Sequence, residues 1–327
     1  MSSEISHALV TGGAGFIGSH IVEALIAKGC KVTVLDNLST GSESNLDPVK
    51  NNITFLEGDI RDRPVLDKAA QSCDTIFHLA AVVSVPETIE DPVNSALTND
   101  MGTLYVLEAA REKGVRRVVF SSSCAVYGDD PRLPKNEAMN PAPCSPYAVQ
   151  KLTGEHHVRL GFDLYGLETV SLRYFNVYGP RQDPSSPYSG VISIFMNKAV
   201  EDQAPVIFGD GNQSRDFIYV ADVVKANLLA ATTAPAQGQT INIGTGADTQ
   251  INRLWEMICA LSGSTHRPQH EPSRSGDIYA SVADISHAKS LLGFEIDYPF
   301  GRGLELTYRW YLSEQKAEDR SQTSADG

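Results

Sequence analysis

Apolar runs alternate with amphipathic stretches in the first half of the chain. Residues 7–11, 31–36 and 116–122 form short apolar runs of the length expected for buried strands. From Phe16 to Lys28 the apolar residues recur at helical spacing on one side. A repeated strand–helix–strand pattern predicts a parallel sheet with helices on both faces. The same reading places further strands at 53–59 and 73–80, a helix near 93–113 and another helix that begins near Pro146.

The second half, from about residue 176, has a less regular pattern. We expect a smaller α+β lobe over residues 176–313, seated on a sheet domain formed by residues 1–175. Residues 314–327 are polar and contain no aromatic residue, and they predict a frayed or disordered end. The elements expected within the lobe are Pro- and Gly-rich loops at 179–190 and 205–214, helices at 191–202 and 221–234, and a last helix from Leu304.

Composition and charge narrow the class of protein. The chain has 327 residues, 42% of them hydrophobic and 20% charged, which is typical of a globular protein, and the length suggests two domains of about 150 residues or one large domain. The formal net charge of −13 disfavours nucleic acid as a partner, because an acidic surface repels phosphate backbones.

The five cysteines are scattered without a CxxC pair, so we expect neither disulfides nor a metal site. We see no secretory signal and no membrane span, and we expect a cytoplasmic protein without a membrane partner.

A glycine motif follows the first predicted strand and opens the first predicted helix. In TGGAGFIG the glycines are Gly12, Gly15 and Gly18, and Asp36 ends the next strand. Glycines here allow a tight turn against a diphosphate, and the carboxylate can accept hydrogen bonds from an adenosine ribose. The motif predicts a dinucleotide site with NAD favoured over NADP; the alternative is a tight turn without a ligand. Asp59 either reaches the adenine or caps a helix.

A second motif combines a serine-rich strand end with a helix that carries tyrosine and lysine. Ser123 lies in SSSCAVYG, and Tyr147 and Lys151 are four residues apart in YAVQK, on one face of the helix. A tyrosine normally titrates near ~10, and a nearby ammonium and a charged nicotinamide are expected to bring its pKa near ~7. Such a tyrosine can take a proton from a substrate hydroxyl. The alternative is an ordinary surface pair of tyrosine and lysine.

Over about residues 7–312 the chain resembles the extended short-chain dehydrogenase/reductase family, specifically its NAD-dependent nucleotide-sugar epimerases, and most of all those acting on UDP-N-acetylglucosamine. The resemblance implies an α/β fold, a Rossmann-type doubly wound parallel sheet of seven strands with a smaller C-terminal α+β substrate lobe, and residues 217–245 returning to the first domain. It also implies a homodimer formed through helices near 94–113 and 147–165. The motifs that carry it are TGGAGFIG, HLAA, SSSCAVYG, SPYAVQK, LRYFNVYGPRQ, GDGNQSRDFIYV, INIGTG and RSGDIYASVAD.

The family's chemistry implies roles for the second motif. Tyr147 would remove the proton of the sugar 4-hydroxyl while hydride passes from C4 to tightly held NAD. The 4-keto sugar would turn over and receive the hydride on its other face. Ser123 would assist Tyr147, and Lys151 would hold the nicotinamide ribose and tune Tyr147.

The resemblance also implies two sets of binding residues. The cofactor residues are Gly12, Gly15, Phe16, Ile17, Gly18, Asp36, Asn37, Asp59, Ile60, Leu79, Ala80, Ala81, Asn99, Ser121, Tyr147, Lys151 and Tyr174. The substrate residues are Ser84, Ser123, Tyr147, Asn176, Gln182, Gly190, Phe208, Arg215, Arg274, Asp277 and Ser281.

Single positions separate the activities within the family. The 4,6-dehydratases have an Asp–Glu pair where this chain has Cys124 and Ala125, and the decarboxylases keep a Glu at the second position. We therefore interpret Cys124, and likewise Cys144, as a packed residue rather than a nucleophile. A bulky Tyr at the position of Ser281 blocks a 2-acetamido group, and a small residue admits it.

These positions predict interconversion of UDP-N-acetylglucosamine and UDP-N-acetylgalactosamine, with UDP-glucose and UDP-galactose as a second pair. Val83 departs from the subgroup, in which glycine is usual. The alternatives are a 4-epimerase of UDP-uronic acids, a non-catalytic NAD-dependent sensor, and an oxidoreductase that releases NADH.

Overall fold

A seven-stranded parallel sheet forms the centre of the computed structural model, which describes residues 4–183, 190–273 and 278–325. The strand order is β11-β6-β5-β4-β1-β2-β3, the doubly wound arrangement that the sequence predicted. Every neighbouring pair is parallel, and the carboxyl ends of the strands therefore share one edge. The strands are β1 (His7–Thr11), β2 (Lys31–Asp36), β3 (Ile53–Glu57), β4 (Thr75–His78), β5 (Arg117–Ser123), β6 (Glu168–Tyr174) and β11 (Gln239–Ile243).

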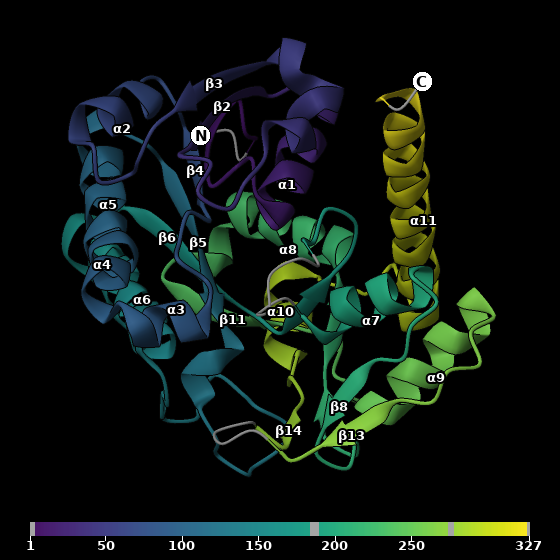
Figure 1. Ribbon diagram of the computed structural model, residues 1–327. Coiled ribbons are helices and arrows are strands. Elements are labelled where there is room, and N and C mark those ends of the chain that lie inside the picture. The colour runs from purple at the N-terminus through teal and green to yellow at the C-terminus, as the bar shows by residue number, and fades with distance from the viewer. Residues whose placement is uncertain (1–3, 184–189, 274–277, 326–327) are drawn as a thin grey trace.

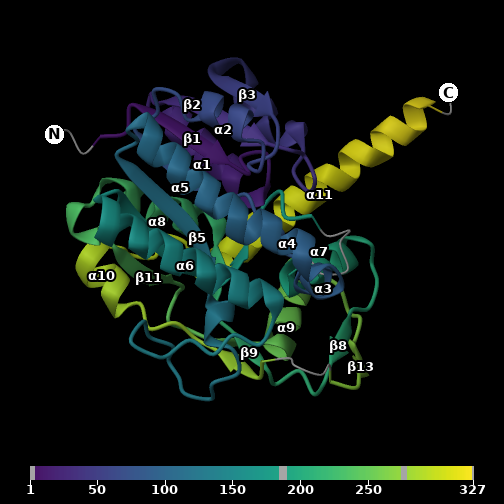
Figure 2. The same ribbon diagram turned by 90° about the vertical axis from the view of Figure 1, so that its left-hand side faces the viewer.

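Helices cover both faces of this sheet, as Figures 1 and 2 show. One face packs against α2 (Arg63–Ala69), α5 (Gly102–Lys113) and α6 (Pro146–Tyr165). The other packs against α1 (Phe16–Ala27), α8 (Val220–Thr232) and α10 (Ser286–Leu292). Because both faces are buried, central strands such as β1 and β2 read as mostly apolar runs rather than alternating ones.

The edge of the sheet is completed by a part of the chain that returns from the second half. β11 pairs with β6 from Gln239 opposite Val170 to Ile243 opposite Tyr174. The preceding α8 lies beside α1. Residues of the second half thus contribute a strand and a helix to the sheet domain.

In its described residues, the smaller lobe is built from short sheets and three helices. Its aromatic core gathers Tyr178, Phe195, Phe217, Trp255 and Tyr311. The helices are α7 (Val191–Val200), α9 (Ile251–Ser262) and α11 (Phe300–Ala325). The strands pair as β7 (Asn176–Tyr178) with β10 (Phe217–Tyr219), β8 (Val206–Phe208) with β13 (Gln269–Glu271), and β9 (Ser214–Arg215) with both β12 (Thr249–Gln250) and β14 (Ala280–Ser281).

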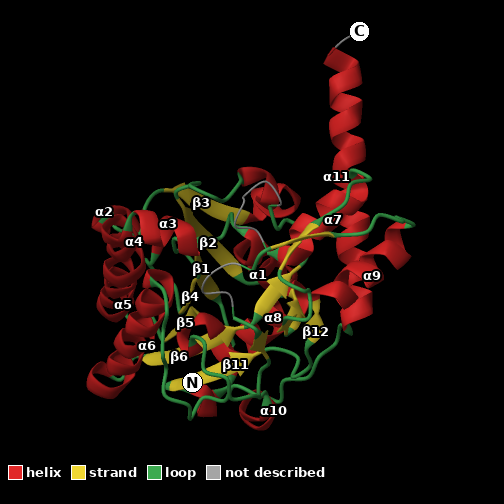
Figure 3. Ribbon diagram, turned by 60° about the horizontal axis from the view of Figure 1, so that its bottom comes forward, coloured by secondary structure: helices red, strands yellow, loops and turns green. Residues whose placement is uncertain are grey.

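The last helix differs from the sequence expectation. α11 begins at Phe300 and continues to Ala325, so residues 314–325 are helical where a disordered end was expected. Leu304 and Tyr311 anchor its first half in the core of the lobe, and the remainder extends away from the body (Figure 3). Glu, Gln, Lys and Ala are good helix formers, so a polar segment can extend a helix that is already nucleated by packing. Among the described residues, no helix has the length and apolar character needed to cross a membrane.

Candidate active site

The glycine turn between β1 and α1 is closed by contacts that leave no room for side chains. Gly12 has φ of +69°, and a Cβ there would lie 2.7 Å from the Ala80 nitrogen. A Cβ on Gly18 would lie 2.1 Å from the Gly12 carbonyl oxygen. Gly15, the N-cap of α1, has no side chain to occupy the first amides of the helix. A bare turn in front of a helix N-terminus fits a dinucleotide diphosphate.

An acidic cluster stands beside this turn at the ends of β2 and β3. The buried Asp36 carboxylate accepts hydrogen bonds from the Ala14 and Leu38 amides, each at 2.9 Å. Asn37 Nδ2 donates to Asp59 Oδ2 at 3.1 Å. The structure therefore brings Asp36, Asn37 and Asp59 together where an adenosine would lie.

Asp59 does not cap the following helix. Its carboxylate is paired with Arg61 at 2.8 Å, and this pairing lowers the pKa of Asp59. The N-cap of α2 is Asp62. Of the two interpretations of Asp59, the structure excludes the helix cap.

The loop after β4 lies across the glycine turn and is held by Asn99. The Leu79 amide donates to the Thr11 carbonyl at 3.1 Å. Asn99 is buried in η2 (Leu97–Met101), accepts from the Val82 amide at 2.8 Å and donates to the Val82 carbonyl at 2.9 Å and to Gln150 Oε1 at 2.7 Å. Both Asn99 donors are thus engaged by protein groups, and the residue positions this loop. The remaining cofactor candidates here are Phe16 and Ile17 at the start of α1, Ile60 after β3, and Ala80 and Ala81 in the loop.

Ser123, Tyr147 and Lys151 come from two neighbouring elements. Ser123 ends β5, and Tyr147 and Lys151 lie one turn apart at the start of α6. Lys151 is buried, and its Nζ donates to the Ser121 carbonyl at 2.8 Å and lies 5.8 Å from the centre of the Tyr147 ring. The hydroxyls of Ser121 and Tyr174 are hydrogen-bonded at 3.0 Å. All of the residues expected around the reacting centre are therefore at the carboxyl edge of the sheet.

Burial dominates the electrostatics of this group. Burial raises the pKa of Tyr147 to about 12, and the hydrogen bond with Ser123 offsets only part of that effect. Burial also lowers the pKa of Lys151 to about 8, against the opposing attraction of Glu155. The expected pKa near ~7 assumed a charged nicotinamide beside Tyr147 in addition to the Lys151 ammonium, so it stays a prediction. In that prediction the positive charge of the bound cofactor acts together with Lys151 to lower the pKa of Tyr147.

The substrate candidates from the second lobe also converge. Ser281 in β14 lies opposite Arg215 in β9 in the register of the two strands. The Ser281 side chain also forms a hydrogen bond with the thiol of Cys124, the residue that follows Ser123. Asn176 Nδ2 donates to the Asp216 carbonyl at 3.1 Å. Three lobe residues thus lie on strands that reach the end of β5.

Other substrate candidates occupy a wider ring. Gln182 and Gly190 are neighbours, since a Cβ on Gly190 would lie 3.1 Å from Gln182 Nε2. Ser84 caps α3 (Val85–Glu90) by accepting from the Glu87 amide at 3.2 Å. Phe208 ends β8. Arg274 and Asp277 lie outside the described residues.

Two buried carboxylates near the site were missed by the sequence reasoning. Glu155, one turn after Lys151, forms a bidentate pair with Arg173 at 2.8 and 2.7 Å and accepts from Ser122 at 2.5 Å. Asp216 follows Arg215 directly. The i, i+4 spacing from Lys151 and the RD pair in GDGNQSRDFIYV were the available signals.

Burial raises the pKa of Cys124 to about 11, which fits a packed thiol rather than a nucleophile.

The site therefore combines a Rossmann-type dinucleotide cradle with a tyrosine–lysine–serine group at the carboxyl edge of the sheet. The NAD dependent epimerase/dehydratase family matches residues 8–244. The chain belongs to this family, whose cofactor is NAD, and the expected resemblance and cofactor are confirmed. The protein is an NAD-dependent enzyme.

Named relatives and solved structures cover almost the whole chain. A UDP-glucose 4-epimerase of Mycolicibacterium smegmatis is 38% identical over 312 residues, which are 94% of this chain and 99% of that protein. The UDP-N-acetylglucosamine 4-epimerase of Methanobrevibacter ruminantium, solved with UDP-N-acetylmuramic acid, is 42% identical with a TM-score of 0.91, covering 96% of this chain and 100% of that one. A UDP-glucuronic acid 4-epimerase of Bacillus cereus, solved with NAD and a fluorinated UDP-glucuronic acid, is 32% identical with a TM-score of 0.88, covering 94% and 99%.

Proposed function

We propose that the protein is an NAD-dependent UDP-sugar 4-epimerase that interconverts UDP-N-acetylglucosamine and UDP-N-acetylgalactosamine, with UDP-glucose and UDP-galactose as a second pair. The observation that carries the proposal is the convergence of Ser123, Tyr147 and Lys151 with Ser281 at the end of β5. Similarity to a UDP-glucose 4-epimerase and to a UDP-N-acetylglucosamine 4-epimerase supports the reaction class.

The proposed reaction assigns a task to each residue. Tyr147 accepts the proton of the sugar 4-hydroxyl and returns it, while Ser123 hydrogen-bonds the same oxygen. Lys151, held by the Ser121 carbonyl, places a buried cation behind the tyrosine. Bound NAD would supply the acceptor and donor for the C4 hydride, which leaves one face of the sugar and returns to the opposite face. Asp36 and the glycine turn hold the nucleotide, and Arg215 pairs with the diphosphate of the UDP-sugar.

Preference for the acetamido sugar is assigned to Ser281. Ser281 is buried on β14 and adjoins Cys124, the residue after the proposed catalytic serine. A small hydroxyl side chain there leaves room for a 2-acetamido group and can hydrogen-bond it. A tyrosine would fill that volume.

The test compares Ser281→Tyr with Ser281→Ala on both sugar pairs. We expect Ser281→Tyr to abolish turnover of UDP-N-acetylgalactosamine and to spare UDP-galactose, and Ser281→Ala to keep both activities. Equal loss of both activities in Ser281→Tyr would show that this residue is no gate. If the wild type epimerises only UDP-glucuronic acid, the uronic-acid alternative is correct.

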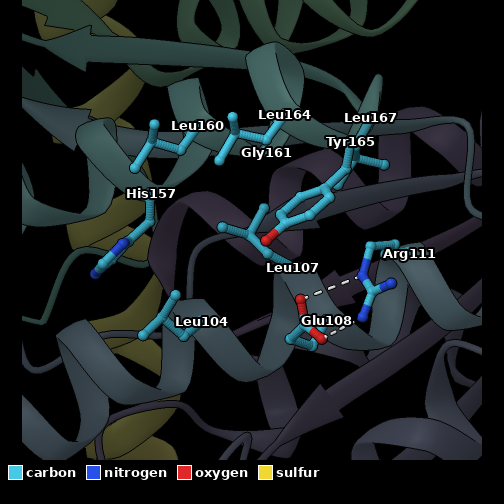
Figure 4. Close-up of a pocket in the computed structure, with 10 residues that line it drawn as sticks. All are labelled: Leu104, Leu107, Glu108, Arg111, His157, Leu160, Gly161, Leu164, Tyr165 and Leu167. Atoms are coloured by element: carbon cyan, nitrogen blue, oxygen red, sulfur yellow. Dashed lines mark hydrogen bonds and ion pairs between the residues drawn. The ribbon is translucent and has the colours of Figure 1, made fainter.

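We also propose a homodimer formed through α5 and α6. Leu160, Leu164 and Tyr165 on α6 are 48%, 65% and 60% exposed, and they flank an apolar hollow (Figure 4). Leu104 and Leu107 of α5 line the same hollow. A second copy of this helix pair would cover these side chains as a four-helix bundle.

Light scattering during gel filtration tests this interface. The wild type should elute as a dimer and Leu164→Glu as a monomer. Leu261→Glu, which alters an exposed leucine on α9, is the matched control and should remain dimeric. A monomeric wild type, or a dimeric Leu164→Glu, would contradict the interface.

A further inference from the structure

Asp216 is a fully buried carboxylate between β9 and β10, with a relative exposure of 0%. Its Oδ1 accepts from the Thr245 amide at 2.8 Å and from the Thr245 hydroxyl at 2.6 Å. Its Oδ2 accepts from the Gly246 amide at 2.9 Å and from the Ala283 amide at 3.1 Å. These four donors are all uncharged, so the carboxylate is held by oriented dipoles.

The backbone of Asp216 extends the same network. Its amide donates to the Ser281 carbonyl at 2.8 Å. Its carbonyl accepts from the amide of Asn176 at 3.0 Å and from Asn176 Nδ2 at 3.1 Å. Asp216 therefore connects three segments that are distant in sequence, and these segments carry Asn176, Arg215 and Ser281.

The pocket around this carboxylate is closely fitted. A Cβ on Gly244 would lie 2.7 Å from Asp216 Oδ2, so no larger residue fits there without movement. Burial raises the pKa of Asp216, and the Thr245, Ala283 and Gly246 hydrogen bonds oppose that effect. The negative charge of Asp216 acts at the sugar end of the site, because it raises the pKa of the Cys124 thiol, whereas the positive charge of Arg215 lowers that pKa.

We propose that Asp216 is the positioning residue that assembles the UDP-sugar side of the site, fixing Arg215, Asn176 and Ser281 relative to one another before substrate binds. The inference rests on the proposed function, which assigns those three residues to substrate. Asp216 touches neither the glycine turn nor the Tyr147–Lys151 pair through any of the hydrogen bonds described above. Its loss therefore acts on substrate binding rather than on cofactor retention or proton transfer.

The test is Asp216→Asn in the NAD-bound enzyme. The amide keeps the volume, but its NH2 group would face the two amide donors of Gly246 and Ala283, or else the two donors of Thr245, and two hydrogen bonds are lost. We expect KM for both UDP-sugars to rise at least tenfold, kcat to change less than threefold, and the amount of bound NAD to stay unchanged.

A matched control separates positioning from general stability. Asp222 is another buried aspartate, at 1% exposure, and it accepts from the amides of Asp297 at 2.9 Å and Tyr298 at 3.2 Å. Asp222→Asn should lower the melting temperature and leave KM unchanged. If Asp216→Asn also lowers the melting temperature without changing KM, Asp216 is merely structural and the inference is wrong.

Two further variants keep the result decisive. If Asp216→Asn does not fold, Thr245→Val removes only the hydroxyl donor and should raise KM about threefold, in keeping with the loss of one hydrogen bond; an unchanged KM overturns the inference. Arg215→Ala tests the underlying assignment. If Arg215→Ala leaves KM unchanged, the proposed substrate side is wrong; if it raises KM and Asp216→Asn does not, only the positioning role is wrong.

Discussion

Replacing the buried Lys151 by methionine should stabilise the protein while it removes the proposed catalytic cation. Lys151 is 5% exposed, and burial lowers its pKa from 10.5 to about 8. At neutral pH the buried lysine is still mostly protonated, and the shift corresponds to ~3 kcal/mol of unfavourable free energy in the folded state. Methionine has a similar length and no charge to desolvate.

The hydrogen bond from Lys151 Nζ to the Ser121 carbonyl opposes this gain. A hydrogen bond from a charged donor contributes ~1.5 kcal/mol, and methionine cannot replace it. The difference leaves a net stabilisation of ~1.5 kcal/mol for Lys151→Met at pH 7. Activity should fall below detection, because the cation behind Tyr147 is gone.

The assay is urea unfolding of wild type and Lys151→Met, both freed of nucleotide, at pH 7 and pH 9.5. The unfolded lysine holds its proton up to about pH 10.5 and the folded lysine only to about pH 8, so the wild type gains stability as pH rises between these values. The advantage of the variant should therefore vanish near pH 9.5. A variant less stable than the wild type at pH 7, or a difference that does not depend on pH, would refute the reasoning.

Three further predictions concern single side chains around the sheet. Burial lowers the pKa of His78 to about 3, so the free energy of unfolding should fall as pH drops below 6.5, by ~2 kcal/mol at pH 5. In unfolding titrations His78→Gln should lose this dependence of stability on pH. An unchanged dependence would contradict the prediction. Gly18→Ala would place a Cβ 2.1 Å from a backbone carbonyl, and we expect purified protein without NAD, whereas Gly161→Ala, with only ordinary contacts, should retain it. Because the pKa of Cys124 is about 11 and Cys144 is exposed, iodoacetamide at pH 7.5 should label Cys144 first by mass spectrometry; equal rates would show that Cys124 is more reactive than its surroundings imply.

Much of the sheet domain could be predicted because strands such as β1 and β2 are short, buried and mostly apolar. The run from Lys31 to Asp36 is a strand with those same bounds, and Asp36 ends it as expected. The strand predicted at 116–122 is shifted by one residue and ends at Ser123. The glycine turn was equally visible, since tight turns and helix starts depend on neighbouring residues. Strands, tight turns and helix starts depend on short stretches of sequence and can be recognised from them.

The parts that could not be predicted depend on contacts between distant segments. Asp216 gathers donors from residues 245–283, and no spacing near Arg215 reveals them. The pKa of Tyr147 depends on how completely the fold excludes water from its side chain. The YxxxK motif alone does not predict this burial. Asn99 is recognisable as a site residue, yet its engagement with Val82 emerges only from the structure. The helix beyond Glu314 depends on the anchoring of Tyr311 in the lobe.

The most direct measurement mixes purified protein with UDP-N-acetylgalactosamine, without added cofactor, and follows the anomeric protons by NMR. The proposed function predicts that UDP-N-acetylglucosamine appears, which requires both the 4-epimerase reaction and NAD retained through purification. Conversion of UDP-galactose alone would contradict the role of Ser281 and indicate a plain UDP-galactose 4-epimerase. No conversion of either sugar, even with NAD added, would contradict the proposed function itself.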